Sequence, residues 1–89
     1  MNCIKETVLK NDVLYINLGV PDLPVKTLAI TVREEIKELF EATEFKNVKI
    51  VRVCGKLTEV TSMALGHIIG KMNKKMQIFN PIDNTFYTV

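Results

Sequence analysis

The second half of the chain is organised around one strongly apolar segment that stops at a glycine. The run from Val48 to Cys54 is almost continuously apolar, and Gly55 follows it directly. Runs of this kind are typical of a central strand that is covered on both faces. A helical pattern over residues 58–74 and a β-rich run over residues 76–79 come next. This half therefore predicts a strand–turn–helix–strand unit.

The first half begins with two β-rich runs that we expect to pair as a hairpin. They cover residues 4–8 and 13–18, and the sequence Lys10-Asn11-Asp12 between them supplies turn chemistry. A short last strand is predicted at the other end of the chain, over residues 85–89, after an Asp-Asn turn.

A helical pattern separates this hairpin from the apolar strand. Apolar residues recur at helical spacing over residues 25–44, and the two prolines within residues 19–24 exclude a regular element before them. Thr31 and Glu34 have the spacing of a capping box, which would begin the helix only at Thr31. A helix is therefore predicted over residues 32–42, and the turns before it are left open.

The resulting order is β-β-α-β-α-β-β, which predicts an α/β domain with a partly parallel sheet. At 89 residues the chain is expected to form a single domain over residues 1–89. A chain of this size buries a limited fraction of its surface, so a second copy often completes such a structure.

Composition excludes several classes of protein. The 12 basic and 10 acidic residues give a net charge of +2, which is too balanced to argue for binding of duplex nucleic acid. No apolar run approaches the ~20 residues of a membrane span, and no signal-peptide pattern is present. Cys3 and Cys54 fit no metal-binding spacing. Two free thiols of this kind predict a reducing, cytoplasmic location.

The junction after the apolar strand is the first candidate site. Ligands bind beyond the carboxyl ends of strands in open α/β sheets, and helix N-termini attract anions. Gly55 would let the backbone approach a phosphate, Lys56 would neutralise it, and Thr58 would cap the helix or donate a hydroxyl group. The alternative is structural: a turn glycine, a solvated lysine and an N-cap threonine.

His67 is the only histidine, and it falls at the border of the apolar stripe of the second helix. A histidine at such a border can act as a general acid or base, bind a metal or stack on a base. It can equally be a half-buried histidine satisfied by a neighbour. No metal site is predicted, because the ligands would have to include Asp83, Glu59 or another subunit.

Two further features lie in the same half. Asn80 and Asp83 follow the second strand of the unit, where they can contact a ligand or simply form a turn. Gly66 and Gly70 are spaced four apart in the helix and are expected to make a smooth strip away from the core, against which a backbone or a flat ligand can pack. Sequence noise is the alternative explanation of these glycines.

Residues 47–89 resemble the small CRISPR-associated ring nucleases related to CARF domains. The resemblance rests on Val-Arg-Val-Cys-Gly-Lys-Leu-Thr (residues 51–58), Ala-Leu-Gly-His (64–67) and Met-Gln-Ile-Phe-Asn-Pro (76–81). In that family one strand ends in Gly-Arg-x-Pro or a similar sequence. The next helix carries a small residue just before a histidine, and the next strand ends in Asp-Pro.

The resemblance implies a CARF-like (Rossmann-like) domain that binds cyclic tetra-adenylate, the alarm signal of type III CRISPR complexes. Some members cleave the ring and switch off the antiviral response, and others only sequester it. Dimers and tetramers sandwich the ring, so a homodimer or homotetramer is expected. Lys56 and His67 are the catalytic residues that it implies. The implied ligand-binding residues are Gly55, Lys56, Leu57, Thr58, Glu59, Ser62, Asn80 and Asp83.

The chain departs from the family at its metal ligands. Metal-dependent members carry a further histidine shortly after the first, where this chain has Gly70, Lys71 and Met72, and the aspartate of Asp-Pro is Asn80 here. An amide is a poorer manganese ligand than a carboxylate. The expectation is therefore cleavage without a metal or other cofactor, with the attack of a ribose 2′-OH on its own phosphate aided by His67 and Lys56.

Three alternatives stay open. The chain can be a binding-only sponge for cyclic tetra-adenylate, or a protein-interaction module that docks a partner on the Gly66 and Gly70 strip. Binding of single-stranded RNA is disfavoured by the charge balance and by the lack of a clear stacking platform. The aromatic residues Tyr15, Phe79, Phe86 and Tyr87 are interpreted as ordinary strand residues.

Overall fold

The computed structural model describes residues 3–19, 23–55 and 58–88. The predicted order β-β-α-β-α-β-β is confirmed, with one short 3₁₀ helix in addition. The elements are β1 (Ile4–Lys10), β2 (Val13–Leu18), α1 (Val25–Leu39), the 3₁₀ helix η1 (Thr43–Phe45), β3 (Ile50–Gly55), α2 (Glu59–Lys71), β4 (Lys75–Asn80) and β5 (Thr85–Thr88).

The five strands form one mixed sheet whose spatial order, β1-β2-β3-β4-β5, follows the chain. The outer pairs β1–β2 and β4–β5 are antiparallel hairpins, and the inner pairs β2–β3 and β3–β4 are parallel. Asn11 and Asp12 form the first turn with φ angles of 53° and 63°, as a two-residue hairpin loop requires. The expectations of a hairpin and of a partly parallel sheet are therefore confirmed.

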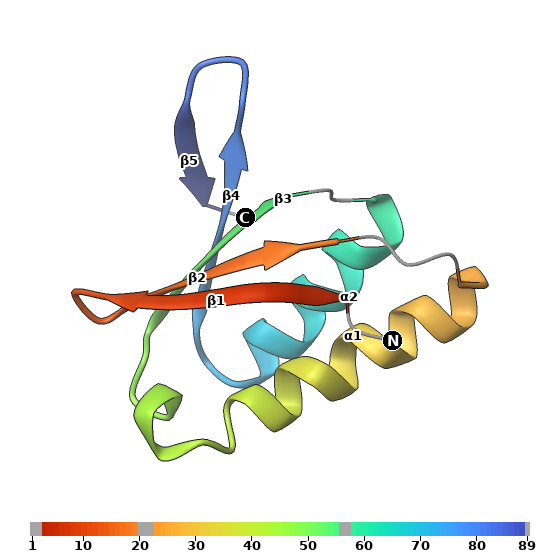
Figure 1. Ribbon diagram of the computed structural model, residues 1–89, viewed down its shortest axis with the longest axis horizontal. Coiled ribbons are helices and arrows are strands. Elements are labelled where there is room, and N and C mark those ends of the chain that lie inside the picture. Colours follow the sequence, from red (N-terminus) through yellow and green to blue (C-terminus); the bar gives the residue numbers. More distant parts are fainter. Residues whose placement is uncertain (1–2, 20–22, 56–57, 89) are drawn as a thin grey trace.

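Both helices lie on one face of the sheet (Figure 1). Crossover connections between parallel strands are almost always right-handed. Both crossovers of this sheet, from β2 to β3 and from β3 to β4, move in the same direction across it. They therefore place α1 and α2 side by side on a single face, and we call the opposite face the open face. The expectation that the central strand is covered on both faces is wrong. The strand order also never reverses, so the sheet has no topological switch point.

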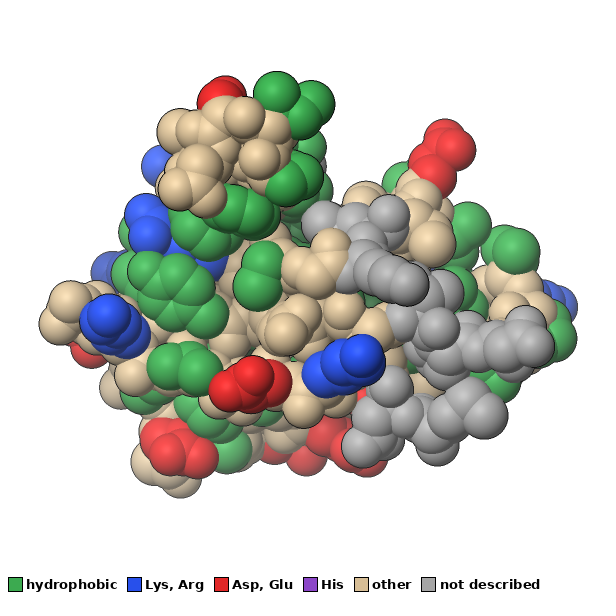
Figure 2. Space-filling model, turned by 45° about the horizontal axis from the view of Figure 1, so that its top comes forward, with side chains coloured by type: hydrophobic (Ala, Val, Ile, Leu, Met, Phe, Trp, Pro, Cys, Tyr) green, Lys and Arg blue, Asp and Glu red, His purple; other side chains and the backbone are tan. Residues whose placement is uncertain are grey.

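Side-chain alternation separates the two faces of the sheet. In β2, Leu14 and Ile16 are buried beneath the helices, whereas Tyr15 between them is half-buried on the open face. In β3, Val53 is buried in the same way and Arg52 is half-buried on the open face. Figure 2 shows hydrophobic side chains gathered below the β4–β5 hairpin, with charged side chains around them.

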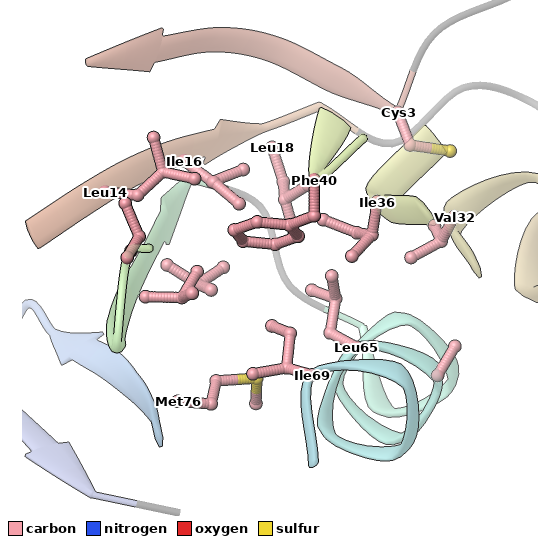
Figure 3. Close-up of a cluster of buried hydrophobic side chains, with 14 of the residues drawn as sticks. Cys3, Leu14, Ile16, Leu18, Val32, Ile36, Phe40, Leu65, Ile69 and Met76 are labelled. Atoms are coloured by element: carbon pink, nitrogen blue, oxygen red, sulfur yellow. The ribbon is translucent and has the colours of Figure 1, made fainter. Parts of the chain in front are cut away.

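The core fills the space between the covered face and the two helices. Figure 3 shows side chains from the strands and from both helices meeting in one cluster, with the ring of Phe40 among them. The carboxylate of Glu35 on α1 fastens the start of β1 to this layer, because it accepts hydrogen bonds from the backbone N–H groups of Cys3 (2.7 Å) and Ile4 (3.3 Å). The completely buried core residues are Cys3, Leu14, Ile16, Val32, Ile36, Val51, Val53, Leu65 and Ile69.

Helix α1 includes the turns whose structure the sequence left open, and it ends earlier than predicted. Its first turn starts at Val25, directly after Pro24, and the backbone N–H of Leu28 donates to the carbonyl of Pro24 at 2.8 Å. The predicted capping box at Thr31 therefore lies inside the helix. The apolar face that packs on the sheet outweighs the low helix propensity of the β-branched residues in these turns. The helix stops at Leu39 rather than at residue 42.

Candidate functional site

The carboxyl ends of the parallel strands bring several predicted binding residues to one edge of the sheet. Leu18 at the end of β2 lies opposite Gly55 at the end of β3. The pairing of β3 with β4 is described up to Val53 and Ile78, two residues before Gly55 and Asn80. Gly55 and Asn80 therefore lie at the same edge, beyond the carboxyl ends of parallel strands, although this sheet has no switch point to open a crevice there.

Gly55 occupies a position that no other residue fits. Its φ angle is +96°, which side-chain-bearing residues rarely adopt. A Cβ atom there would lie 2.3 Å from the carbonyl oxygen of Leu18 and 2.4 Å from the side-chain oxygen of Asn17. The glycine thus lets the end of β3 approach the backbone of β2. The residues that follow it, Lys56 and Leu57, lie outside the described part of the chain, so their predicted roles stay predictions.

Thr58 caps the N-terminus of α2, as one of its two predicted roles required. Its hydroxyl accepts from the backbone N–H of Thr61 at 3.2 Å, and the hydroxyl of Thr61 accepts from the backbone N–H of Thr58 at 2.9 Å. This reciprocal pair fixes the direction of the helix entry. The neighbouring predicted residues are exposed Glu59 and half-buried Ser62. The carboxylate of Glu59 opposes an anion at this position, because it brings a negative charge into the first turn.

Asn80 and Asp83 form the turn between β4 and β5. The side-chain oxygen of Asn80 accepts from the backbone N–H of Ile82 at 3.0 Å. A carboxylate oxygen of Asp83 accepts from the backbone N–H and the hydroxyl of Thr85 at 3.3 Å and 2.7 Å. The turn-forming interpretation is therefore confirmed for both residues. The amide N–H groups of Asn80 are the part of this turn that can still donate to a ligand.

His67 lies far from this edge within one chain. It is exposed on α2, nine residues after Thr58. At 1.5 Å per residue this separates the two residues by about 13 Å along the helix axis. A single chain therefore does not bring the imidazole together with Gly55 and Thr58.

The surroundings of His67 are a shallow surface pocket between α1 and α2. Its volume is about 300 Å³, and its polar lining contains three cationic side chains, Arg33, Lys37 and Lys71, with one acidic side chain, Glu34. Ile30, which is 42% exposed, adds an apolar wall. This pocket can hold a small anionic group at the surface, but it is open and lies on the helix layer rather than at the sheet edge.

The prediction that Gly66 and Gly70 both lie away from the core is wrong for Gly66. A Cβ atom at Gly66 would lie 3.9 Å from the terminal methyl group of Met76 on β4, so half-buried Gly66 lies beside the sheet rather than away from the core. Gly70 is exposed, with no atom within 4 Å of such a Cβ. The two glycines therefore differ in exposure, and docking of a partner on the Gly66 and Gly70 strip stays a prediction.

The thiols and carboxylates of the described residues offer little metal or nucleophilic chemistry. No three His, Cys, Asp or Glu side chains within residues 3–19, 23–55 and 58–88 are grouped to hold a metal ion. Burial raises the pKa of the Cys54 thiol, and the charge of Glu6 raises it further. A thiol with a raised pKa stays protonated and is a poor nucleophile. In the same ranges, no helix has the length and apolar character to cross a membrane.

A cluster on the open face was missed by the sequence reasoning. The guanidinium of Arg52 donates to the hydroxyl of Tyr15 at 2.8 Å and to the side-chain oxygen of Gln77 at 2.9 Å. Its central carbon lies 4.7 Å from the ring centroid of Phe86, which in turn lies 5.3 Å from that of Phe79. Three of the four aromatic residues that were interpreted separately thus gather on one surface. The available signal was a charged residue in the middle of an apolar strand.

Comparison of the chain with family models, with curated proteins and with solved structures found no match. The relation of residues 47–89 to ring nucleases, and the CARF-like nature of the fold, therefore stay predictions. The established description is a small α/β domain with two helices on one face of a five-stranded mixed sheet.

Proposed function

We propose that this CARF-like domain binds cyclic tetra-adenylate at the carboxyl edge of its sheet and cleaves the ring between two subunits, which ends a type III CRISPR antiviral signal. The observation that supports this most is the capped N-terminus of α2, which follows the end of β3 at the carboxyl edge of the sheet. Together with the resemblance of residues 47–89, it puts a helix N-terminus, which attracts anions, where the family's motif falls.

Binding would use backbone groups more than side chains. The first N–H groups of α2 lack partners within the helix, and the capping pair of Thr58 and Thr61 satisfies only part of them. The positive end of the helix dipole and the ammonium group of Lys56 would attract a phosphate of the ring. The amide of Asn80 would add a donor from the neighbouring strand. Glu59 weakens this attraction, so binding is expected to need more than one subunit.

Cleavage would need His67 from a second subunit. In the proposed step a ribose 2′ oxygen attacks the adjacent phosphorus, the bond from phosphorus to the 5′ oxygen breaks, and a 2′,3′-cyclic phosphate and a free 5′-hydroxyl result. One base takes the 2′ proton, and one acid protonates the leaving 5′ oxygen. His67 would serve as one of them and Lys56 would stabilise the phosphorane charge. The axial separation of about 13 Å between Thr58 and His67 rules out this arrangement in a single chain.

Binding without cleavage is the second candidate function. The same exposure of His67 on the helix layer favours it, because a ring held at the sheet edge of one chain would not contact the imidazole. The domain would then be a sponge that removes the signal by sequestering it. Ring binding and its strength are common to both candidates, and the appearance of linear products separates them.

The test is incubation of the purified protein with radiolabelled cyclic tetra-adenylate, with EDTA or with manganese, followed by native-gel and product analysis. Metal-independent cleavage predicts linear products that persist in EDTA and are lost in His67→Ala. Lys26→Ala is the matched control, because Lys26 is an exposed side chain of α1 outside the pocket that His67 lines. A retarded band with an intact ring identifies the sponge. No retardation and no product would refute both candidates.

A mixing experiment tests the shared site. Lys56→Ala and His67→Ala are each expected to be inactive alone. If each site takes Lys56 from one subunit and His67 from another, mixed oligomers of the two variants contain some intact sites and regain part of the activity. Mixing that restores nothing, when mixed oligomers are shown to form, would contradict a site shared between subunits.

A further inference from the structure

Strand β1 forms one edge of the sheet, and no described residue pairs with its outer side (Figure 1). An edge strand presents a row of free backbone N–H and C=O groups, which can pair with another strand. β1 is the longer of the two edge strands, with seven residues against four in β5. It is therefore the edge that offers more positions for pairing.

Two consecutive apolar side chains of β1 are exposed, one on each face of the sheet. Val8 is 46% exposed opposite Tyr15 on the open face, and Leu9 is 42% exposed opposite Leu14 on the covered face. A strand added outside β1 would give both of them a second cross-strand neighbour, and such pairs stabilise sheets. Exposure on both faces at once therefore points to an added strand rather than to a layer that covers one face.

The turn after β1 determines which of its backbone groups point outward. Two positive φ angles make residues 11–12 a type I′ turn. Such a turn closes on a hydrogen-bonded pair, which here joins Lys10 to the first residue of β2. Bonded and non-bonded positions alternate along an antiparallel pair, so Val8 also bonds to β2. The N–H and C=O groups of Thr7 and Leu9 then point away from β2, toward the free edge.

The sequence of β1 complements itself when two copies run antiparallel about Val8. In that register Val8 lies opposite its own copy, and Glu6 lies opposite Lys10 of the partner in both halves of the contact. All three side chains lie on the open face. On the other face Thr7 lies opposite Leu9, which joins their outward backbone groups in about four hydrogen bonds. Charges that shield an edge strand from other chains would thus pair with their own copy.

The ends of β1 limit this pairing to residues 6–10. A bulge interrupts the register between Ile4 and Glu6, and the turn follows Lys10. Lys5 in the bulge and Asp12 in the turn add one charge of each sign outside the paired positions, so they leave the charge balance of the edge unchanged. One strand from each copy makes a small interface, and a weak dimer is therefore expected.

We propose that two copies of this chain pair along β1, which joins their sheets into one continuous sheet with both helix layers on the same side. The two-fold axis passes between the two Val8 residues, perpendicular to the sheet. The pairing does not depend on any nucleotide, and it uses no residue of β3 or α2. Cleavage as proposed above needs His67 at the sheet edge of another subunit, which is a separate contact. The two contacts together would give an oligomer larger than a dimer.

Cysteine cross-linking tests the register. In a Cys54→Ser background, Val8→Cys is expected to form a disulfide-linked dimer in mild oxidant, because the axis sets the two Cβ atoms about 5 Å apart. The remaining Cys3 is buried. Thr7→Cys is the matched control at the adjacent position. Its two copies would lie diagonally, more than about 7 Å apart, and should cross-link at least about tenfold more slowly. A disulfide that forms as fast at Thr7→Cys overturns the proposed pairing.

A charge exchange tests the two ion pairs. Sedimentation of the full chain from about 10 µM to about 1 mM measures the dimer dissociation constant. Glu6→Lys and Lys10→Glu should each raise that constant about fivefold or more, because each sets like charges opposite one another twice. The double variant should regain most of the loss. A double variant as weak as the two single variants contradicts the register.

A proline tests the backbone pairing. Thr7→Pro removes an outward N–H group, which an edge strand tolerates, so the variant should keep its circular dichroism spectrum and lose the dimer. A folded Thr7→Pro variant that still dimerises like the wild type overturns the proposal. A wild-type chain that stays monomeric up to about 1 mM also overturns it, and would leave the edge to a strand of another protein.

Discussion

The two faces of the sheet are made by the same strands and differ in almost every property. Beneath the helices the side chains are aliphatic and fully buried, as Leu14 and Val53 are. On the open face their neighbours Tyr15 and Arg52 are half-buried and hydrogen-bonded to each other. Whether the helices cover a position, rather than which strand carries it, decides whether the side chain there is aliphatic or polar. The contrast also locates the buried core on one face of the sheet.

The largest expected effect separates the faces by stability. Leu14→Ala should lower the free energy of unfolding by about 2–5 kcal/mol, because it leaves a cavity beneath the helices. Val13→Ala, the adjacent position on the open face, should cost less than about 1 kcal/mol, because Val13 is half-exposed already. Urea denaturation at low micromolar protein measures both. Equal losses of unfolding free energy in the two variants would contradict the difference between the two faces.

A second comparison is between two glycines, Gly55 at the carboxyl edge of the sheet and Gly70 in α2. Gly55→Ala should destabilise the domain by about 2 kcal/mol or more, since its φ is +96° and the new Cβ would collide with the backbone of Leu18. Gly70→Ala should instead stabilise it by about 0.5–1 kcal/mol, because this exposed helical position has open space. Thermal and urea unfolding of both variants give the sign of each change in the free energy of unfolding. A tolerated Gly55→Ala would contradict the described edge.

The buried thiol of Cys3 predicts that the stability of the domain depends on pH. Burial and the nearby Glu35 carboxylate raise the pKa of Cys3 from 9.0 to about 11. Between these pH values the unfolded chain releases a proton that the folded chain keeps, so stability falls as the pH rises through this window. The loss attributable to Cys3 is at most about 2.7 kcal/mol.

Unfolding free energies measured from pH 8 to 11 test this expectation. Cys3→Ala should flatten the decline, whereas Cys54→Ala should retain the part that Cys3 causes. A decline of the same depth in Cys3→Ala would show that another group is responsible.

The smallest expected effect sharpens the comparison on the open face itself. Arg52→Lys keeps the charge but loses the planar group that bonds to Tyr15 and Gln77 and stacks on Phe86. The expected cost is about 1 kcal/mol in unfolding free energy. Arg33→Lys on the exposed side of α1 is the control and should stay within about 0.5 kcal/mol. Equal effects would mean that the cluster adds no stability of its own.

Much of the secondary structure could be predicted because its signals are local. The hairpin turn at Asn11 and Asp12 and the N-cap at Thr58 follow from short-range chemistry. The start of α1 could not be predicted, because the spacing of Thr31 and Glu34 imitates a cap and only packing against the sheet overrides it. Coverage of one face depends on the strand order, and no local pattern encodes that order.

The candidate site was predicted less completely. The edge position of Gly55 follows from a strand that ends in glycine before a helix, and the structure adds the steric reason. The separation of His67 from that edge needed the length of α2 and its direction. The Arg52 cluster depends on pairing between strands that are distant in the sequence, and register of this kind is invisible in a single segment.

The strand order has a consequence for how the molecule assembles. Every strand pairs with the strand that precedes it in the chain, so no later strand must be inserted between two that are already paired. The β1–β2 hairpin is complete first, and each crossover then delivers one strand to the growing edge. Contacts that form between consecutive segments favour rapid folding. The domain is therefore expected to build its sheet in one direction while it is being synthesised, with β5 as the last strand to join.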